Sequence, residues 1–518
     1  MSKAFLKNTS LVGAMTLVSR ITGLLRDMVY ARLFGASPLM DAFLVAFKIP
    51  NFLRRITGEG AFSQAFIPVV SEYKSTKTHA EVDELVAGVM GTLGGILLLV
   101  TGIGVIAAPW LILLFAPGFE QAGGRLDLAS DMLRFTFPYI FFISLTALGS
   151  GVLNTYGKFG VAAFNPVILN VVMLVAALGF AEQSKSPGTV LALGVFVAGV
   201  VQLLAQFRGL HRLGLLSLPR WRWHHAGVRR IGALMLPGIF GSSVGQIAQL
   251  LDTWIASFLM TGSITWMYYA VRLAEFPMGV FAIALSTVIL PGLTEHHTNQ
   301  SAERFNATLD WALRLTLWVS LPAAVALLVL AGPLIATING YGFFNAHDVT
   351  MSALALMANA LGLMGLSLVK VLAPAFYARQ DTRTPVRIGI IALSVAIGFD
   401  LLIVAPYAWF HGPFPHAVLA LSSGIGAYVN VWLLYRGLRR LNIYQPLTGW
   451  PRLWAKALLA NALMAIVVWQ LAGPWSQWMI WRGTERVIHL VICVIAGLCV
   501  YVLTWLALGW RPKDLQHS

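Results

Sequence analysis

Long apolar runs follow one another along almost the whole chain, and they constrain its fold more than any other feature. Only 11% of the 518 residues are charged, about half of the fraction found in soluble domains. The runs have about the length that a helix needs to cross a bilayer, and they predict an all-α polytopic membrane protein with fourteen transmembrane helices, near 8–34, 39–70, 86–115, 131–155, 161–182, 188–207, 231–260, 264–293, 311–337, 350–376, 386–410, 414–435, 453–473 and 486–509. Within the third run, Gly91 and Gly95 predict close helix–helix contact.

Basic residues are concentrated in alternate connections between these runs. The net charge is +15, and the longest basic segment, residues 208–230, separates the sixth run from the seventh. Cytoplasmic loops of membrane proteins carry such an excess of lysine and arginine, so we expect both termini in the cytoplasm and contacts with anionic membrane lipids. Trp221, Arg222 and Trp223 predict an interfacial amphipathic segment in this connector. Charge distributed in this way argues against nucleic-acid binding.

The sequence contains an internal repeat at a shift of about 220 residues. Asp27 and Ala31 in the first run match Asp252 and Ala256 in the seventh, and further matches follow in the same order. Two six-helix halves with the same membrane orientation are related by an axis along the membrane normal. We therefore predict four parts: an N-terminal lobe over residues 1–207, a basic cytoplasmic connector over 208–230, a C-terminal lobe over 231–440 and two additional helices over 441–518.

Five arginines lie inside the apolar runs, namely Arg20, Arg26, Arg54, Arg55 and Arg272. A guanidinium near the bilayer centre costs roughly 2.5–3.5 kcal/mol, so such a residue normally faces a watery cavity or an anionic partner. Lys48 precedes Arg55 by seven residues, which places both on one stripe of an ideal helix. The planar guanidinium suits bidentate phosphate binding. The cluster therefore predicts a large anionic ligand that carries a phosphate or diphosphate group.

Four acidic residues accompany these cations and leave a second interpretation open. Asp27, Asp41, Glu59 and Glu275 could each neutralise a nearby arginine and thereby tie helices together. Arg272 and Glu275, for example, are three residues apart and would be neighbours on a helix. Basic residues still outnumber acidic ones in the first two runs, so we expect uncompensated positive charge there.

The sequence shows neither a catalytic set nor a metal-binding set. Cys493 and Cys499 lie in one apolar run and indicate packing rather than disulfide or metal chemistry, and there is no Walker-type phosphate loop. We therefore predict a transporter without a cofactor, not an enzyme. Its energy would come from a Na+ or H+ gradient, the membrane potential or the substrate gradient. Asp252 and Asp400, isolated acids of the second lobe, either bind a coupling cation or form structural hydrogen bonds.

Five segments are distinctive enough for comparison with known families: 19–27 (SRITGLLRD), 50–55 (PNFLRR), 58–68 (GEGAFSQAFIP), 268–277 (YYAVRLAEFP) and 378–385 (ARQDTRTP). Together they resemble the signature motifs of the MurJ (MviN) family of lipid II flippases. The similarity spans essentially the whole chain, and the first 70 residues are its most specific part.

This resemblance implies the fold of the MOP exporter superfamily, with two six-helix lobes and two extra helices, in the bacterial cytoplasmic (inner) membrane. The implied substrate is lipid II, the undecaprenyl-diphosphate-linked MurNAc-pentapeptide-GlcNAc precursor of peptidoglycan, which is moved from the inner to the outer leaflet. Cell-wall synthesis proteins are implied as further partners. In that family the last two helices form a groove for the lipid tail.

The resemblance also implies roles for individual residues. The arginines that match Arg20, Arg26, Arg54 and Arg272 line the cavity and engage the diphosphate, and the acid that matches Asp41 is functionally sensitive. The aspartate that matches Asp252 belongs to a sodium site in one relative. Residue 396, one turn before Asp400, is alanine in this chain, so the complete set of sodium ligands is not matched.

Three other functions fit part of these observations. A flippase for another polyprenyl-diphosphate oligosaccharide satisfies the charge pattern equally well, and only the family motifs separate it. A cation-coupled multidrug exporter of the same superfamily should show exposed acids and aromatic residues rather than an excess of arginine. A membrane scaffold for cell-wall enzymes, without transport, is the third.

Overall fold

The computed structural model describes residues 3–55, 61–121, 123–284, 293 and 301–509, and every regular element in these residues is a helix. The chain divides into two compact units, Met1–Gly262 and Ser263–Ser518. Each predicted apolar run overlaps at least one helix, because a helix satisfies its own backbone groups where a bilayer supplies no water. Ten helical spans in the described residues are long and apolar enough to cross a membrane by length and composition.

The first unit contains ten α-helices in the residues that are described: α1 (Lys3–Phe34), α2 (Pro38–Arg54), α3 (Ala61–Thr76), α4 (His79–Ile106), α5 (Ala108–Phe115), α6 (Arg125–Thr136), α7 (Tyr139–Thr155), α8 (Phe159–Ala176), α9 (Pro187–Arg212) and α10 (Ala226–Ala256). Local sequence explains several boundaries. Ser37 caps α2, whose first residue is Pro38, and Thr78 forms a capping box with Glu81 at the start of α4. The run predicted at 86–115 is divided between α4 and α5, immediately before Pro109.

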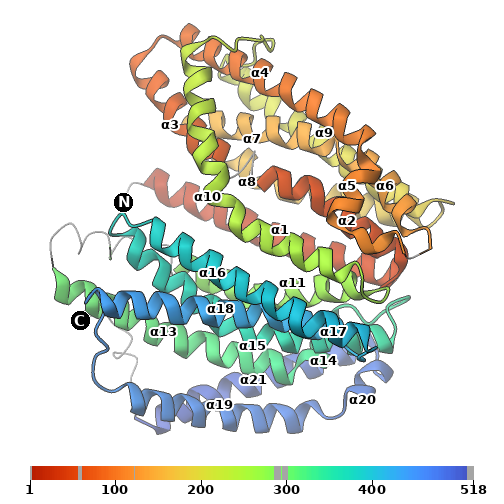
Figure 1. The fold of residues 1–518 in the computed structure, drawn as a ribbon, viewed down its shortest axis with the longest axis vertical. Helices are drawn as coiled ribbons and strands as arrows, with labels where there is room; N and C mark the ends of the chain where they lie inside the picture. Colours follow the sequence, from red (N-terminus) through yellow and green to blue (C-terminus); the bar gives the residue numbers. More distant parts are fainter. Residues whose placement is uncertain (1–2, 56–60, 122, 285–292, 294–300, 510–518) are drawn as a thin grey trace. The chain divides into compact units, whose positions relative to one another are not determined.

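Helix α7 contacts α3, α4 and α9, and α1 packs along α8 (Figure 1). The apolar core between these helices is built from fully buried side chains such as Phe66, Leu85, Leu148 and Leu153. Helix α10, which the repeat assigns to the second lobe, packs on α3 and belongs to the first compact unit.

The basic connector between α9 and α10, residues 213–225, is not helical and lies against α4. A Cβ atom built at Gly91 would be 2.3 Å from the backbone of Arg220, and one at Gly95 would be 2.6 Å from the ring of Trp221. The helix–helix contact predicted at Gly91 and Gly95 is therefore wrong. The glycines instead admit an extended segment, whose Trp221 is 63% exposed.

The second unit contains ten described α-helices: α11 (Ser263–Ala284), α13 (Ala302–Val329), α14 (Ala331–Ile338), α15 (Ala346–Tyr377), α16 (Arg383–Phe399), α17 (Ala405–Trp409), α18 (Pro415–Arg440), α19 (Trp450–Ala472), α20 (Trp475–Ile480) and α21 (Gly483–Ala507). Helix α15 packs against α11, α13 and α18 (Figure 1). A Cβ at Gly362 of α15 would lie 2.7 Å from the Cα of Gly424 in α18, so glycine at these positions permits close approach of the two helices.

The last two long helices, α19 and α21, lie side by side. A polar anchor, formed by Asp310, Tyr444 and Trp450, joins the beginning of α19 and the segment before it to α13. Buried Asp310 of α13 accepts hydrogen bonds from the Tyr444 hydroxyl at 2.6 Å and the Trp450 indole at 2.8 Å. Burial and this carboxylate raise the pKa of Tyr444, so its hydroxyl keeps the proton that it donates. The anchor thus fixes where α19 begins.

Candidate functional site

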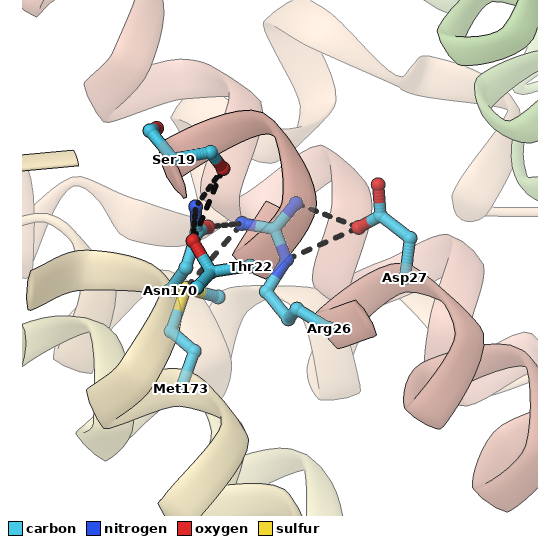
Figure 2. A network of polar contacts seen from close by, with 6 residues as sticks. All are labelled: Ser19, Thr22, Arg26, Asp27, Asn170 and Met173. Carbon is cyan, nitrogen blue, oxygen red and sulfur yellow. Dashed lines mark hydrogen bonds and ion pairs between the residues drawn. The ribbon is translucent and has the colours of Figure 1, made fainter. Parts of the chain in front are cut away.

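Arg26 lies in a buried polar network between α1 and α8 (Figure 2). Its Nε and Nη2 donate to Oδ1 of Asp27 at 3.1 and 2.7 Å, and its Nη1 donates to Oδ1 of Asn170 at 3.1 Å. The sulfur of Met173 lies 3.8 Å from the same Nη1. Arg26 and Asp27 are each 4% exposed. In this conformation, therefore, the guanidinium charge is largely compensated by a carboxylate inside the first unit.

Asn170 completes this network and was not among the predicted site residues. Its amide nitrogen donates to the backbone oxygen of Ser19 at 3.1 Å and to the hydroxyl of Thr22 at 3.3 Å, while its amide oxygen accepts from Arg26 (Figure 2). A buried amide costs free energy unless it is hydrogen-bonded. An asparagine in the apolar run at 161–182 was the sequence signal that could have identified it.

The other two arginines in this part of the first unit that match the family motifs have more open environments. Arg20 of α1 is exposed, and Arg54 at the end of α2 is partly buried. The Nε of Arg54 donates to Oδ1 of Asn51 at 3.2 Å, a contact within the same helix. Both guanidinium groups are therefore accessible enough to contact an anionic ligand.

Two further cations, Lys48 in α2 and Arg55 directly after it, donate to oxygens of α10. The Nζ of Lys48 donates to the backbone oxygen of Gln249 at 2.8 Å and to the hydroxyl of Thr253. The Nη1 of Arg55 donates to the side-chain oxygens of Gln246 at 3.2 Å and Gln249 at 3.3 Å. These oxygens are neutral, so each of them lowers the positive charge at Lys48 and Arg55 less than a carboxylate would.

Asp41 is fully buried and connects three parts of the first unit. Its Oδ2 accepts the backbone N–H of Gly262 at 2.7 Å and lies 3.8 Å from Nη1 of Arg125, the first residue of α6. The Arg125 guanidinium also lies 4.9 Å from the ring centroid of Phe119. Asp41 is thus paired with a cation that the sequence analysis did not consider, because Arg125 is distant along the chain.

In the second unit, Arg272 of α11 is exposed and its guanidinium carbon lies 5.7 Å from the ring centroid of Tyr268. Glu275 on the same helix interacts electrostatically with Lys370 of α15. Lys370 is a further cation that the sequence analysis missed. Its signal was the same as that of the arginines, a basic residue inside the apolar run at 350–376.

The two acids predicted for cation coupling lie in different units. Asp252 of α10 is partly buried and interacts electrostatically with Lys48. Asp400 is buried at the start of a short π-helical turn, Asp400–Val404, in the second unit. In the part of the chain that the structure describes, no group of three or more histidine, cysteine, aspartate or glutamate side chains could hold a metal ion. Glu59 lies outside the described residues.

These helices and intramembrane cations define the chain as a multi-pass membrane transporter. Its fold is similar to that of an inward-facing multidrug resistance MATE family transporter of the MOP superfamily. The TM-score is 0.65 at 15% sequence identity, with 82% of this chain and 94% of that chain covered. At this identity the likeness concerns the fold alone.

The chain belongs to the MurJ lipid II flippase family, whose model matches residues 30–501. It is 42% identical to the probable lipid II flippase MurJ of Vibrio cholerae, over 100% of this chain and 98% of that protein. It is 41% identical to the lipid II flippase MurJ of Burkholderia cenocepacia, over 96% of each chain. A solved lipid II flippase MurJ in the inward closed conformation is 26% identical, with a TM-score of 0.79 and coverage of 96% of this chain and 100% of that one.

Proposed function

We propose that this chain moves lipid II from the inner to the outer leaflet of the bacterial cytoplasmic membrane. The observation that carries the proposal is the full-length relationship to lipid II flippases, at 42% identity to the Vibrio cholerae protein. The cations inside its apolar helices support it independently, because a diphosphate is a ligand for which such costly residues are retained. A transporter of this kind makes and breaks no covalent bond.

The proposed architecture is fourteen transmembrane helices, arranged as lobes over 1–207 and 231–440 joined by the connector 208–230, with two helices over 441–518. Both termini would be cytoplasmic. The two lobes would alternate between inward and outward access while the polyprenyl chain stays in lipid. Cations that repel one another oppose closure, and the diphosphate removes this repulsion by neutralising them. Substrate binding would therefore drive the closing step.

The direct ligands that we propose for the diphosphate are the cations with accessible surface. They are Arg20, Arg54, Arg55, Lys48, Arg272 and, from the structure, Lys370. Arg26 can join them only when its contacts with Asp27 and Asn170 are broken, so its engagement requires a change at the α1–α8 interface. Asp41, Glu59 and Glu275 would position these cations. Asp252 and Asp400 are left as candidates for coupling to Na+ or H+.

The test is translocation of fluorescent or isotopically labelled lipid II in vesicles that contain the purified protein. Arg20→Ala and Arg272→Ala should each lower the rate at least tenfold. Arg→Lys at the same positions should restore it only in part, because lysine keeps the charge but lacks the planar fork of donors. Arg134→Ala is the matched control, since Arg134 is exposed and paired with Asp131. Normal translocation by both alanine variants, at normal expression, would refute the proposed site.

A depletion experiment separates the proposed substrate from the nearest alternative. Cells depleted of this protein should accumulate lipid II on the inner leaflet. Accumulation of a different polyprenyl-diphosphate oligosaccharide would instead identify that molecule as the substrate.

A further inference from the structure

Helix α10 is attached to the rest of the first unit at both of its ends. At its beginning, Arg230 forms an ion pair with Glu72 of α3 at 2.9 Å. At its end, the hydroxyl of Ser257 accepts the backbone N–H of Gly118 at 3.0 Å. These contacts attach α10 to α3 and to the segment that contains Gly118, so the oxygens near the end of α10 have a defined position.

Residues 246–253, in the C-terminal part of α10, present several of these oxygens to Lys48 and Arg55. The backbone oxygen of Gln249 accepts from Lys48 and also from the hydroxyl of Thr253, at 2.8 and 3.0 Å. The amide oxygens of Gln246 and Gln249 both face one nitrogen of Arg55, and Asp252 adds a negative charge within electrostatic range of Lys48. Two separate cations are thus satisfied by one helix.

The hydrogen bonds from Lys48 and Arg55 to α10 are weaker than the bonds that the same cations would make to a phosphate group. A hydrogen bond from a cation to a neutral amide or hydroxyl has only one charged member, whereas a bond from the same cation to a phosphate oxygen has two. The oxygens of α10 therefore satisfy Lys48 and Arg55 when phosphate is absent, but phosphate oxygens are the better acceptors for them.

We infer that α10 is an internal competitor of the substrate's diphosphate. Its oxygens occupy Lys48 and Arg55 until phosphate oxygens replace them, and the replacement releases residues 246–253 of α10 from these two cations. This inference rests on the proposed function and adds a regulatory role for Gln246, Gln249 and Thr253, which act on the cations and need not touch the substrate. A competitor that must be displaced weakens the apparent affinity for the ligand by the fraction of competent protein.

The experiment measures the affinity of purified protein for undecaprenyl diphosphate in detergent. In the double variant Gln246→Leu/Gln249→Leu the amide oxygens are absent, so the dissociation constant should fall about threefold to tenfold. Thr253→Val keeps the β-branched shape but lacks the hydroxyl that accepts from Lys48, so it should also lower the dissociation constant. Gln64→Leu is the matched control, because Gln64 is an exposed residue of α3. Its affinity should equal that of the wild type.

A hydrogen-exchange measurement supplies the second readout. Addition of undecaprenyl diphosphate to the wild type should speed amide exchange in residues 246–253, and the double variant should show the faster exchange without ligand. A merely structural role for the glutamines predicts weaker binding instead.

Unchanged or weaker binding by the double variant and by Thr253→Val, with melting temperatures near that of the wild type, would overturn the competitor role alone. A wild-type protein that does not bind undecaprenyl diphosphate would overturn the proposed function, and the competitor role with it. The two failures are therefore distinguishable from the wild-type measurement.

Discussion

Replacing Arg26 with methionine should destabilise the first unit by about 3–5 kcal/mol, because it leaves the carboxylate of Asp27 buried without its ion-pair partner. The magnitude follows from the geometry: both side chains are about 95% inaccessible, and two nitrogens of Arg26 donate to the same oxygen of Asp27. For a unit of this size, such a change in free energy corresponds to a decrease of about 6–10 °C in melting temperature.

A double-mutant cycle measured by thermal unfolding in detergent tests this reasoning. Asp27→Leu alone should be as damaging as Arg26→Met, whereas the double variant should regain most of the lost stability, since an apolar pair of similar volume replaces a buried ion pair at little cost. The sum of the single effects should thus exceed the effect of the double variant. Melting temperatures within the error of the wild type for both single variants would refute a stabilising pair.

The same double variant separates stability from transport. If Arg26 binds the diphosphate after the α1–α8 interface opens, the variant should be stable and still defective in lipid II translocation. Normal translocation would remove Arg26 from the proposed ligands and leave it a purely structural role.

Three further predictions concern other parts of the first unit. Asp41→Asn should lower stability by about 1–3 kcal/mol because it weakens the acceptor of a buried N–H and removes a buried charge partner, while the exposed Asp127→Asn should have no measurable effect on the melting temperature. Gly91→Ala should displace the connector and speed its cleavage by trypsin, whereas Gly102→Ala on the same helix, where a Cβ meets open space, should leave the cleavage rate unchanged. Burial and a neighbouring arginine lower the pKa of His225, the N-cap of α10. A depressed pKa in the folded state means that the unfolded chain binds the proton more tightly, so stability should fall as the pH falls below the ordinary histidine value of 6.5. His225→Asn, in which an amide oxygen can replace Nδ1 as the capping acceptor, should flatten this pH dependence, and an equally steep dependence in the variant would contradict it.

Much of the fold could be predicted from the sequence because bilayer crossing is a local requirement. About twenty consecutive apolar residues must form a helix wherever they meet lipid, and each predicted run does overlap a helix. The contact made by Gly91 and Gly95 could not be predicted in this way. Small residues permit close approach, but they do not specify whether a helix or an extended connector approaches.

The candidate site, too, could be predicted from the sequence only in part. Its cations were identified from the sequence, since a charge in an apolar run is visible without a structure. Of their partners, the sequence offered Asp27 as a neutralising acid, and Arg26 is indeed paired with it. Asn170, which accepts from Arg26, and Arg125, which is paired with Asp41, were not identified. These partners lie on other helices or on a neighbouring face, and sequence spacing gives no distance between helices.

By itself, then, the sequence determined that this chain spans a membrane many times, that it keeps costly positive charges inside its apolar helices and that it has the motifs of the lipid II flippase family. Only the tertiary structure decided which of these charges are compensated. Arg26 is buried against a carboxylate, whereas Lys48 and Arg55 donate hydrogen bonds to neutral oxygens of α10, with Asp252 within electrostatic range of Lys48. The physical reason is that transfer to lipid depends on the composition of each segment, whereas the energy of a charge depends on the atoms within a few ångströms of it, and packing alone brings those atoms together.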